Sequence, residues 1–367
     1  MRAAPIRVLV IDDSAFSRQA IARMLRASPL IEVVDTARNG EEALRKTLAL
    51  EPDLVTLDLE MPRMDGFTFL RIMMSRRPTP IIVVSGRSDQ GDVWKALELG
   101  AVDFVAKPTP HATPMLASIA QELIRKVHAV RDLRIDKVRE RIAAPPALVA
   151  RHEVASPAPE IVVIGSSTGG PAALMQIFSA FSEPPRCAFL VAQHMPKGFT
   201  RGFADRLDRL TAMRAREAVG GEEPEPGCVL VAPGGRHMEV DRVAGRPTVR
   251  VVANLTGDRH TPSVDRLFES ASKVYRSQLL GIVLTGMGDD GRIGAQAIRA
   301  SGGTVIAESE ESAVIFGMPR QVIKCGAADF VLPLDEIART VQRGLGVPMS
   351  GERLGAHGAH PEGDEHE

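Results

Sequence analysis

Residues 161 to 171, IVVIGSSTGGP, place glycines and hydroxyl residues directly after a run of β-branched and aliphatic residues. Within this run, Gly165 to Gly169 fit the spacing G-x-S-x-G, in which a sharp strand-to-helix turn presents the central serine as a nucleophile. The spacing predicts Ser167 as that nucleophile.

Two other interpretations of the turn stay open on its residues alone. Gly169 and Gly170 can serve only to turn a buried strand into a helix that Pro171 begins. Backbone N–H groups at such a helix start can also bind a phosphate. The turn has neither the G-x-G-x-x-G spacing of dinucleotide sites nor the Gly-Lys-Ser/Thr of phosphate-binding loops.

A serine nucleophile requires a base that accepts its proton and a third group that orients the base. His194 follows the apolar run CAFLVAQ, whereas His237 lies in a predicted strand and His260 in a predicted loop before a helix. His194 is the best-placed base because it follows the end of a strand, as the serine turn does.

The third group must be acidic, and the sequence LLGIVLTGMGDDGRIGAQAI offers two candidates, Asp289 and Asp290. Turns rich in glycine and aspartate usually have only a structural role. An aspartate here can nevertheless hold an imidazole in one tautomer, and the glycine-rich backbone can face an oxyanion. The order Ser, His, Asp differs from the Ser, Asp, His order of α/β-hydrolases. The residues alone do not choose between the two aspartates.

A second group of polar residues follows the predicted strands near the N-terminus: Asp12 and Asp13, Asp58, Ser85 and Lys107. The carboxyl ends of parallel strands meet at one edge of a sheet, so these side chains are expected together. Single residues of this kind are often helix caps, but clustered carboxylates favour a cation such as Mg²⁺. Asp58 can then act as a nucleophile that forms an aspartyl phosphate, stabilised by Lys107 and the metal.

Short apolar runs alternate with helix-like segments along the chain, which is typical of parallel sheets covered by helices. The runs begin near residues 6, 53, 80 and 102, and again near 161, 187, 228, 279 and 303, with a helix over about 113–140 between the two sets. Residues 143–160 contain four prolines and no periodicity, as linkers do. The sequence therefore predicts an α/β protein of two domains.

Composition narrows the function further. The chain has 367 residues, 45 Lys plus Arg against 46 Asp plus Glu, and a net charge of -1, which argues against nucleic acid as a partner. Cys187, Cys228 and Cys325 form no C-x-x-C pair, so reduced core cysteines are expected. No signal peptide or membrane span is predicted, and we expect a cytoplasmic protein without membrane insertion.

Residues 6 to 110 resemble a response-regulator receiver domain, on the motifs IDDS at 11, LDLEMPRMDG at 57, VVSG at 83 and KP at 107. The resemblance implies a flavodoxin-like, doubly wound α/β fold that is phosphorylated at Asp58. It implies Mg²⁺ ligands at Asp13, Asp58 and the backbone carbonyl of Glu60, with Asp12 in support. It also implies switch positions at Ser85 and Phe104, beside Lys107.

Residues from about 160 to 345 resemble the catalytic domain of the chemotaxis protein-glutamate methylesterases. The motifs that carry the resemblance are GSSTGG, QHMPKGFTRGFADRL, LTGMGDDG, APGGRHMEV and RHTPSVDRLF. It implies an α/β domain with a mostly parallel sheet, and the site residues Ser167 (nucleophile), His194 (general base), Asp290 (its orienting group), Met287 (backbone oxyanion donor) and Thr168 (site lining). The chain departs from the family at Ser166, where alanine is more frequent, and at Asp289, where asparagine is frequent.

Together the two resemblances imply a receiver over 1–128, a linker over 129–158, a catalytic domain over 159–348 and a disordered polar tail over 349–367. The implied activity is phosphorylation-activated hydrolysis of glutamate γ-methyl esters, with deamidation of glutamines, on the cytoplasmic helical region of chemoreceptors. The implied partners are those receptors and a sensor histidine kinase as phosphodonor. We expect a monomer, Mg²⁺ in the receiver, and no cofactor for ester hydrolysis.

Three other functions fit the sequence less well. A phospho-dependent adaptor would not need a complete triad. A metallohydrolase using His194 and His237 would lack close-spaced ligands such as H-x-x-x-H, and a DNA-binding output would lack a basic recognition helix. A tether of about 15 to 20 residues also keeps two domains at high effective concentration, so we expect the unphosphorylated receiver to pack over the serine site.

Overall fold

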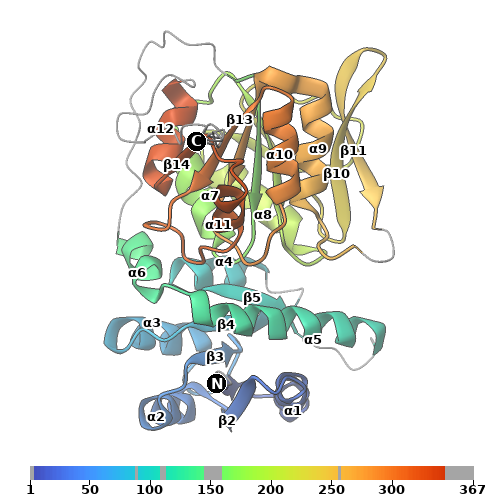
Figure 1. Cartoon of the computed structure of the whole chain (residues 1–367). Helices are drawn as coiled ribbons and strands as arrows, with labels where there is room; N and C mark the ends of the chain where they lie inside the picture. The colour runs from blue at the N-terminus through green and yellow to red at the C-terminus, as the bar shows by residue number, and fades with distance from the viewer. Residues whose placement is uncertain (1–3, 87–89, 108–112, 144–158, 255–257, 344–367) are drawn as a thin grey trace, which may run out of the picture.

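Figure 1 shows the computed structural model, which describes residues 4–86, 90–107, 113–143, 159–254 and 258–343. An N-terminal α/β domain, blue to teal, lies against a larger C-terminal α/β domain, green to red. No helix among these residues is long and apolar enough to cross a membrane. The predicted fold class, two α/β domains in tandem, is confirmed.

The N-terminal domain is a parallel five-stranded sheet in the order β2-β1-β3-β4-β5. Its strands are β1 (Ile6–Ile11), β2 (Ile31–Ala37), β3 (Leu54–Leu57), β4 (Ile81–Ser85) and β5 (Asp103–Ala106). Its helices are α1 (Ala15–Arg26), α2 (Gly40–Leu50), α3 (Gly66–Arg76), α4 (Gln90–Glu98) and α5 (Thr113–His128).

Helices cover both faces of this sheet because its strands are apolar on both faces. Leu9 packs in a cluster with Phe69 of α3 and Trp94 of α4, whereas its neighbour Val8 packs with Leu25 of α1 and Leu123 of α5. Polar residues therefore gather only where the strands end, and the chain reverses into the helices there. This is the edge at which the predicted phosphorylation pocket lies.

The C-terminal domain is a parallel seven-stranded sheet with a separate antiparallel hairpin. The sheet order is β14-β13-β12-β6-β7-β9-β8, from β6 (Ile161–Ser166), β7 (Ala188–Gln193), β8 (Arg214–Glu217), β9 (Cys228–Val231), β12 (Leu279–Val283), β13 (Thr304–Glu308) and β14 (Phe330–Leu332). The hairpin is β10 (Arg236–Val243) and β11 (Arg246–Ala253). The helices are α7 (Gly170–Ser179), α8 (Phe199–Leu210), α9 (Val264–Tyr275), η2 (Arg276–Gln278), α10 (Arg292–Ala300), α11 (Met318–Lys324) and α12 (Leu334–Arg343).

The strand order of this sheet reverses at its middle. The chain enters at β6, adds β7, β9 and β8 on one side, and then returns to add β12, β13 and β14 on the other. In open α/β sheets, ligands bind beyond the carboxyl ends of the strands at the point where the strand order reverses, which here is the carboxyl end of β6. The loop after β6 begins with Ser167.

Several strands are not predicted by the apolar runs of the sequence, namely β2, β8, β11 and β14. Each lies at the edge of its sheet or hairpin. Edge strands are covered on fewer sides, so polar residues alternate into them, as the exposed Arg214 and Arg216 do in β8. A search for continuous apolar runs misses such strands.

The helix predicted over about 113–140 is wrong as one continuous element. Instead, α5 ends at His128 and is followed by the short 3₁₀ helix η1 (Ala129–Asp132) and by α6 (Ile135–Ala143). Between them Leu133 is extended and pairs with Ile315, while the N–H of Arg134 donates to the carbonyl of Val314 at 3.0 Å. Contacts with the C-terminal domain thus outweigh the helical periodicity. The first part of the expected linker, 129–143, is ordered against that domain.

Candidate active site and phosphorylation pocket

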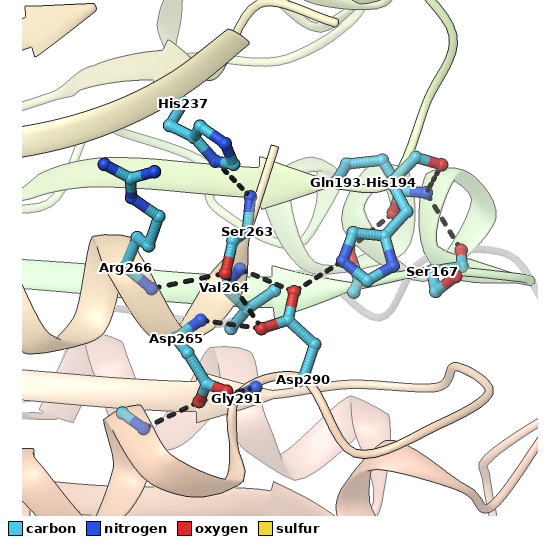
Figure 2. A network of polar contacts seen from close by, with 12 residues as sticks. Ser167, Gln193, His194, His237, Ser263, Val264, Asp265, Arg266, Asp290 and Gly291 are labelled. Atoms are coloured by element: carbon cyan, nitrogen blue, oxygen red, sulfur yellow. Dashed lines mark hydrogen bonds and ion pairs between the residues drawn. The ribbon is translucent and has the colours of Figure 1, made fainter. Parts of the chain in front are cut away.

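Ser167 and His194 follow neighbouring parallel strands. Ser166 of β6 pairs with Gln193 of β7, so the next residue on each strand emerges at the same edge of the sheet. The side chain of Gln193 ties the two loops together, because its Nε2 donates to the carbonyl of Ser167 at 2.9 Å. Figure 2 shows Ser167 beside the ring of His194.

The two serines of the turn have different environments. The hydroxyl of Ser166 is buried and donates to Oε1 of Gln193 at 2.6 Å, so it is held inside the sheet. A Cβ atom on residue 170 would lie only 2.0 Å from that same oxygen, which explains why this residue is glycine. Gly169 has a φ of +79°, a conformation that glycine adopts without strain. The chain can therefore turn sharply into α7 and leave Ser167 at the carboxyl edge of the sheet.

His194 is bonded to Asp290. Its Nε2 lies 2.8 Å from Oδ2 of Asp290, and both side chains are buried. Burial raises the pKa of Asp290, but hydrogen bonds from His194 and from the backbone N–H groups of Asp265 and Val264 outweigh it, so the pKa lies below the usual range. An ionised carboxylate only accepts, so Nε2 carries the proton. The buried Nδ1 of His194 then presents a lone pair and has no hydrogen-bond partner among the described residues.

Asp290, rather than Asp289, is the aspartate that reaches His194. Asp289 is exposed, whereas Asp290 is 5% exposed and also accepts hydrogen bonds from the hydroxyl of Ser263 and the N–H groups of Val264 and Asp265. These donors are the cap and first turn of α9, where a negative charge is stabilised by the helix dipole. Figure 2 shows this network between Asp290 and the start of α9.

The loop after β12 brings Met287 to the same edge. Gly286 donates its N–H to the carbonyl of Ile315 at 3.0 Å and accepts from the N–H of Gly317 at 3.1 Å, which fixes the loop. The N–H of Met287 makes no hydrogen bond to any described residue. It is therefore a free backbone donor in a fixed loop, as an oxyanion site requires.

His260 belongs to the site, although the sequence pattern did not single it out. Its ring stacks on that of His194 with the centroids 4.5 Å apart and the planes 1° from parallel. Burial, followed by the neighbouring His194, lowers the pKa of His260 to about 4, so it is neutral at pH 7. Only the path of the loop before α9 brings His260 here, and no spacing in the sequence reveals that path.

His237 lies in a separate pair. Its Nε2 is 2.9 Å from Asp258, and its Nδ1 accepts the N–H of Ser263 at 3.2 Å. His237 thus anchors the start of α9 instead of sharing a metal site with His194. Among the described residues, the one cluster of carboxylate, His or Cys ligand atoms that could hold a metal is Asp12, Asp13 and Asp58.

That cluster forms the pocket predicted at the N-terminal sheet edge, with ligand atoms within 4.8 Å of one another. Lys107 Nζ lies 2.7 Å from Asp58 and 3.4 Å from Asp12. Burial, and next the charge of Asp58, raise the pKa of Asp12 to about 6, and Oδ2 of Asp12 makes no hydrogen bond among the described residues. A buried carboxylate oxygen that makes no hydrogen bond and lies among other carboxylates fits a hard cation such as Mg²⁺.

The other residues predicted for this pocket lie around it. Glu60 is exposed, and its N–H is 3.4 Å from Oδ1 of Asp58. Ser85 is buried at the end of β4, next to Ala106 of β5. Phe104 is fully buried in β5 and contacts Phe199 of the other domain.

The interface between the domains reaches the serine turn. Asp103 of β5 accepts a hydrogen bond from the hydroxyl of Thr168 at 2.5 Å. The ring centroid of Phe104 lies 4.7 Å from that of Phe199, at the start of α8. The residue that follows the predicted nucleophile is thus bonded to the N-terminal domain.

Comparison with known proteins identifies relatives of both domains. The family described as CheB methylesterase matches residues 162–341, and the response regulator receiver domain matches residues 8–119. Protein-glutamate methylesterase/protein-glutamine glutaminase 3 of Geobacter sulfurreducens is 47% identical over 363 residues, which cover 93% of this chain and 98% of that protein. Protein-glutamate methylesterase/protein-glutamine glutaminase 1 of Myxococcus xanthus is 47% identical over 332 residues, covering 90% and 95%.

Among solved structures, the crystal structure of the Thermotoga maritima CheB methylesterase catalytic domain is 40% identical, with a TM-score of 0.49, and covers 51% of this chain and 98% of that chain. The relatives match nearly the whole chain, and the two matched domains occur in the order receiver, then methylesterase. The chain therefore belongs to the protein-glutamate methylesterase/protein-glutamine glutaminase family.

Proposed function

We propose that the chain is a serine hydrolase that removes methyl groups from glutamate γ-methyl esters, and deamidates glutamines, on chemoreceptors. The observation that carries the assignment of the site is the state of His194. Its Nε2 is bonded to the ionised Asp290, and its free Nδ1 lies at the edge where Ser167 emerges. This leaves a basic nitrogen at the same edge of the sheet as the serine, and an acid that stabilises the imidazolium formed next.

In the proposed reaction, Ser167 attacks the ester carbonyl while Nδ1 of His194 accepts the hydroxyl proton. The N–H of Met287 stabilises the oxyanion of the tetrahedral intermediate. His194 then gives its proton to the leaving methoxide, and methanol departs from an acyl-enzyme. Water, deprotonated by the same nitrogen, hydrolyses the acyl-enzyme to free glutamate. With a glutamine substrate the leaving group is ammonia, and the product is the same.

Phosphorylation of Asp58 is the proposed control. Asp12, Asp13 and Asp58 would hold Mg²⁺, together with the backbone carbonyl of Glu60, and the cation would offset the charge of the phosphoryl group. A sensor histidine kinase is the proposed phosphodonor. Lys107, which is bonded to Asp58, would bind an oxygen of the new phosphoryl group. The resulting shift of Lys107 would pull on β5.

The proposed link to the active site is β5 itself. Lys107 directly follows this strand, and Asp103 and Phe104 begin it, so one strand joins the phosphorylation pocket to the domain interface. In the state described, Asp103 and Phe104 hold the receiver against Thr168 and Phe199. A cavity of about 350 Å³ lined by both domains remains within this interface. Incomplete packing of this kind favours an interface that can open when phosphorylation shifts the population.

The activity is tested by incubating the full-length protein with receptor whose glutamates carry labelled methyl groups, with and without a small-molecule phosphodonor and Mg²⁺. We expect release of labelled methanol, and faster release with the phosphodonor. Asp58→Asn should release methanol at the basal rate under both conditions. No methanol from wild type in either condition would refute the assigned activity.

The closed interface is tested by exchanging a charge pair across it. Arg206 of α8 is bonded to Glu98 of α4, and neither is near the triad in the sequence. Arg206→Glu should raise the unphosphorylated rate severalfold, because two acids then face each other. Adding Glu98→Arg should restore the low rate. Equal basal rates in wild type, single variant and double variant would show that this interface does not restrict the enzyme.

A further inference from the structure

The loops that build the active site carry positive side chains. Lys197 lies in the loop that begins with His194, Arg236 at the start of β10, Arg259 beside His260, and Arg292 two residues after Asp290. We call Lys197, Arg236, Arg259 and Arg292 the basic rim. None of these side chains makes a hydrogen bond or ion pair with a described residue. Arg292 is half-buried and the others are exposed.

Each loop of the basic rim contacts another rim loop or carries a residue that contacts the triad. A Cβ atom on Gly235 would lie 3.6 Å from Cβ of Lys197, so the loops before β10 and α8 are in contact. The N–H of Gly234 also donates to the hydroxyl of Thr200, at the start of α8. Arg259 precedes the histidine that stacks on His194, and Arg292 follows the aspartate that binds it.

Most acidic side chains on these loops are already bonded to other residues. Asp258 is engaged by His237 and Arg266, and Asp290 by His194. Asp289 remains as an exposed acid. The loop after β13, the strand next to β12, carries the exposed Glu310 and Glu311. The loops after β7, β9 and β12 and the loop before α9 therefore carry unpaired cations around Ser167, whereas the loop after β13 carries exposed acids.

We propose that the basic rim binds free carboxylates that neighbour the esterified glutamate on the substrate helix. This inference rests on the proposed function and deepens it. On a helix, side chains three and four residues away lie about 5–6 Å from the reacting one, within reach of loops around the site. Opposite charges around a site raise the rate of productive encounter, and the effect falls as salt increases.

The consequence is an order of hydrolysis. A methyl-glutamate flanked by free glutamates is hydrolysed faster than one flanked by uncharged residues, by about two- to fivefold per carboxylate at low ionic strength, which is the range for exposed charge pairs. Each hydrolysis creates a new carboxylate. The first demethylation on a receptor helix therefore speeds the next one nearby.

The test compares two helical peptides that each carry one methyl-glutamate. In one peptide the residues three and four positions away on both sides are glutamates; in the other they are alanines, which keep the helix and are not substrates. Methanol release by the full-length protein, with phosphodonor and Mg²⁺, gives kcat/KM at low and high ionic strength. We expect the glutamate-flanked peptide to be favoured at least about fivefold at low salt, and the ratio to approach one at high salt.

The variant Lys197→Gln/Arg259→Gln should reduce the low-salt ratio to near one. Lys273→Gln is the matched control, because Lys273 is an exposed, unpaired lysine in the last turn of α9, at the opposite end from the site; it should keep the wild-type ratio. Equal rates for the two peptides in wild type, or an unchanged ratio in the double variant, would overturn the proposal. If wild type releases methanol from neither peptide, the proposed function itself fails, and this inference fails with it.

Discussion

Asp103 of the receiver is bonded on opposite sides to Lys126 of its own domain and to Thr168 of the catalytic domain. Nζ of Lys126 lies 2.8 Å from Oδ1, and the hydroxyl of Thr168 lies 2.5 Å from Oδ2. Burial lowers the pKa of Lys126, but Asp103 and Glu122 outweigh it and the net pKa is raised, so the lysine remains charged. A buried ion pair therefore fixes the carboxylate that reaches the residue beside Ser167.

This relationship predicts the behaviour of Asp103→Asn. The substitution keeps the shape of the side chain but removes the charge from the hydrogen bond with Thr168, and charge-assisted bonds are about twice as strong as neutral ones. We expect the rate of the unphosphorylated protein to rise about three- to tenfold while the phosphodonor-stimulated rate changes little. Glu32→Gln, an exposed receiver carboxylate on β2, is the control and should change neither rate. A basal rate equal to wild type in Asp103→Asn would argue against this contact as a restraint.

The paired aspartates provide a second prediction. Asp290→Asn should lower kcat by about 10³–10⁴, because an amide at this position can leave His194 in the wrong tautomer. Asp289→Asn should be mild or slightly faster, since Asp289 is exposed and lies near the basic rim. Turnover of each variant on methylated receptor is the measurement. The reverse ranking would show that Asp289, and not Asp290, orients His194.

Asp265 and Asp290 provide a prediction for stability against pH. Asp290 accepts from the first turn of α9, while Asp265 in that turn accepts the N–H groups of Gly291 and Gly294 at the start of α10. Burial raises the pKa of Asp265 to about 6, above the ordinary value near 4. Ionising it therefore costs free energy in the folded state, and its contribution to the free energy of unfolding falls as pH rises from about 4 to 6.

Asp265→Asn keeps the accepting oxygen and removes this titration. Relative to wild type, the variant should gain about 1 kcal/mol in free energy of unfolding between pH 4.5 and 7, an amount reduced by partial exposure. Urea unfolding at the two pH values measures the difference. Asp289→Asn is the exposed control and should show no such gain. A relative loss of stability for Asp265→Asn as pH rises would contradict this prediction.

Metal removal distinguishes the metal requirement of the receiver from that of the catalytic domain. Chelation of divalent cations should abolish stimulation by the phosphodonor, because the carboxylate pocket would hold Mg²⁺, and should leave the basal methanol release within about twofold, because the proposed ester hydrolysis uses only side chains and water. Restoring Mg²⁺ should restore stimulation. Loss of the basal rate on chelation would point to a metal in the hydrolytic site.

Much of the site could be predicted because the chemistry follows strand ends. Ser167, His194 and Asp290 each come directly after, or in the turn after, a buried apolar strand, and parallel strands bring such positions to one edge. The same rule places Asp12, Asp58 and Lys107 together. Here local pattern and topology point to the same answer.

The remaining features depend on packing between distant segments. The stack of His260 on His194 depends on the path of a loop. The hydrogen bonds that Asp290 accepts from the start of α9, and Asp265 from the start of α10, depend on the close approach of two helices. The break in the helix at Leu133 arises because its backbone pairs with Ile315, 182 residues later (315 − 133). No local pattern encodes such contacts.

The measurement that tests the account most directly is methanol release by Ser167→Ala and Ser166→Ala under phosphodonor stimulation. The hydroxyl of Ser166 is bonded to Gln193 inside the sheet, whereas Ser167 emerges beside His194. We predict that Ser167→Ala loses at least about a thousandfold in kcat, as removal of a nucleophile does, while Ser166→Ala keeps roughly a third or more of the wild-type rate. Equal losses in the two variants, or substantial activity in Ser167→Ala, would contradict the proposed mechanism.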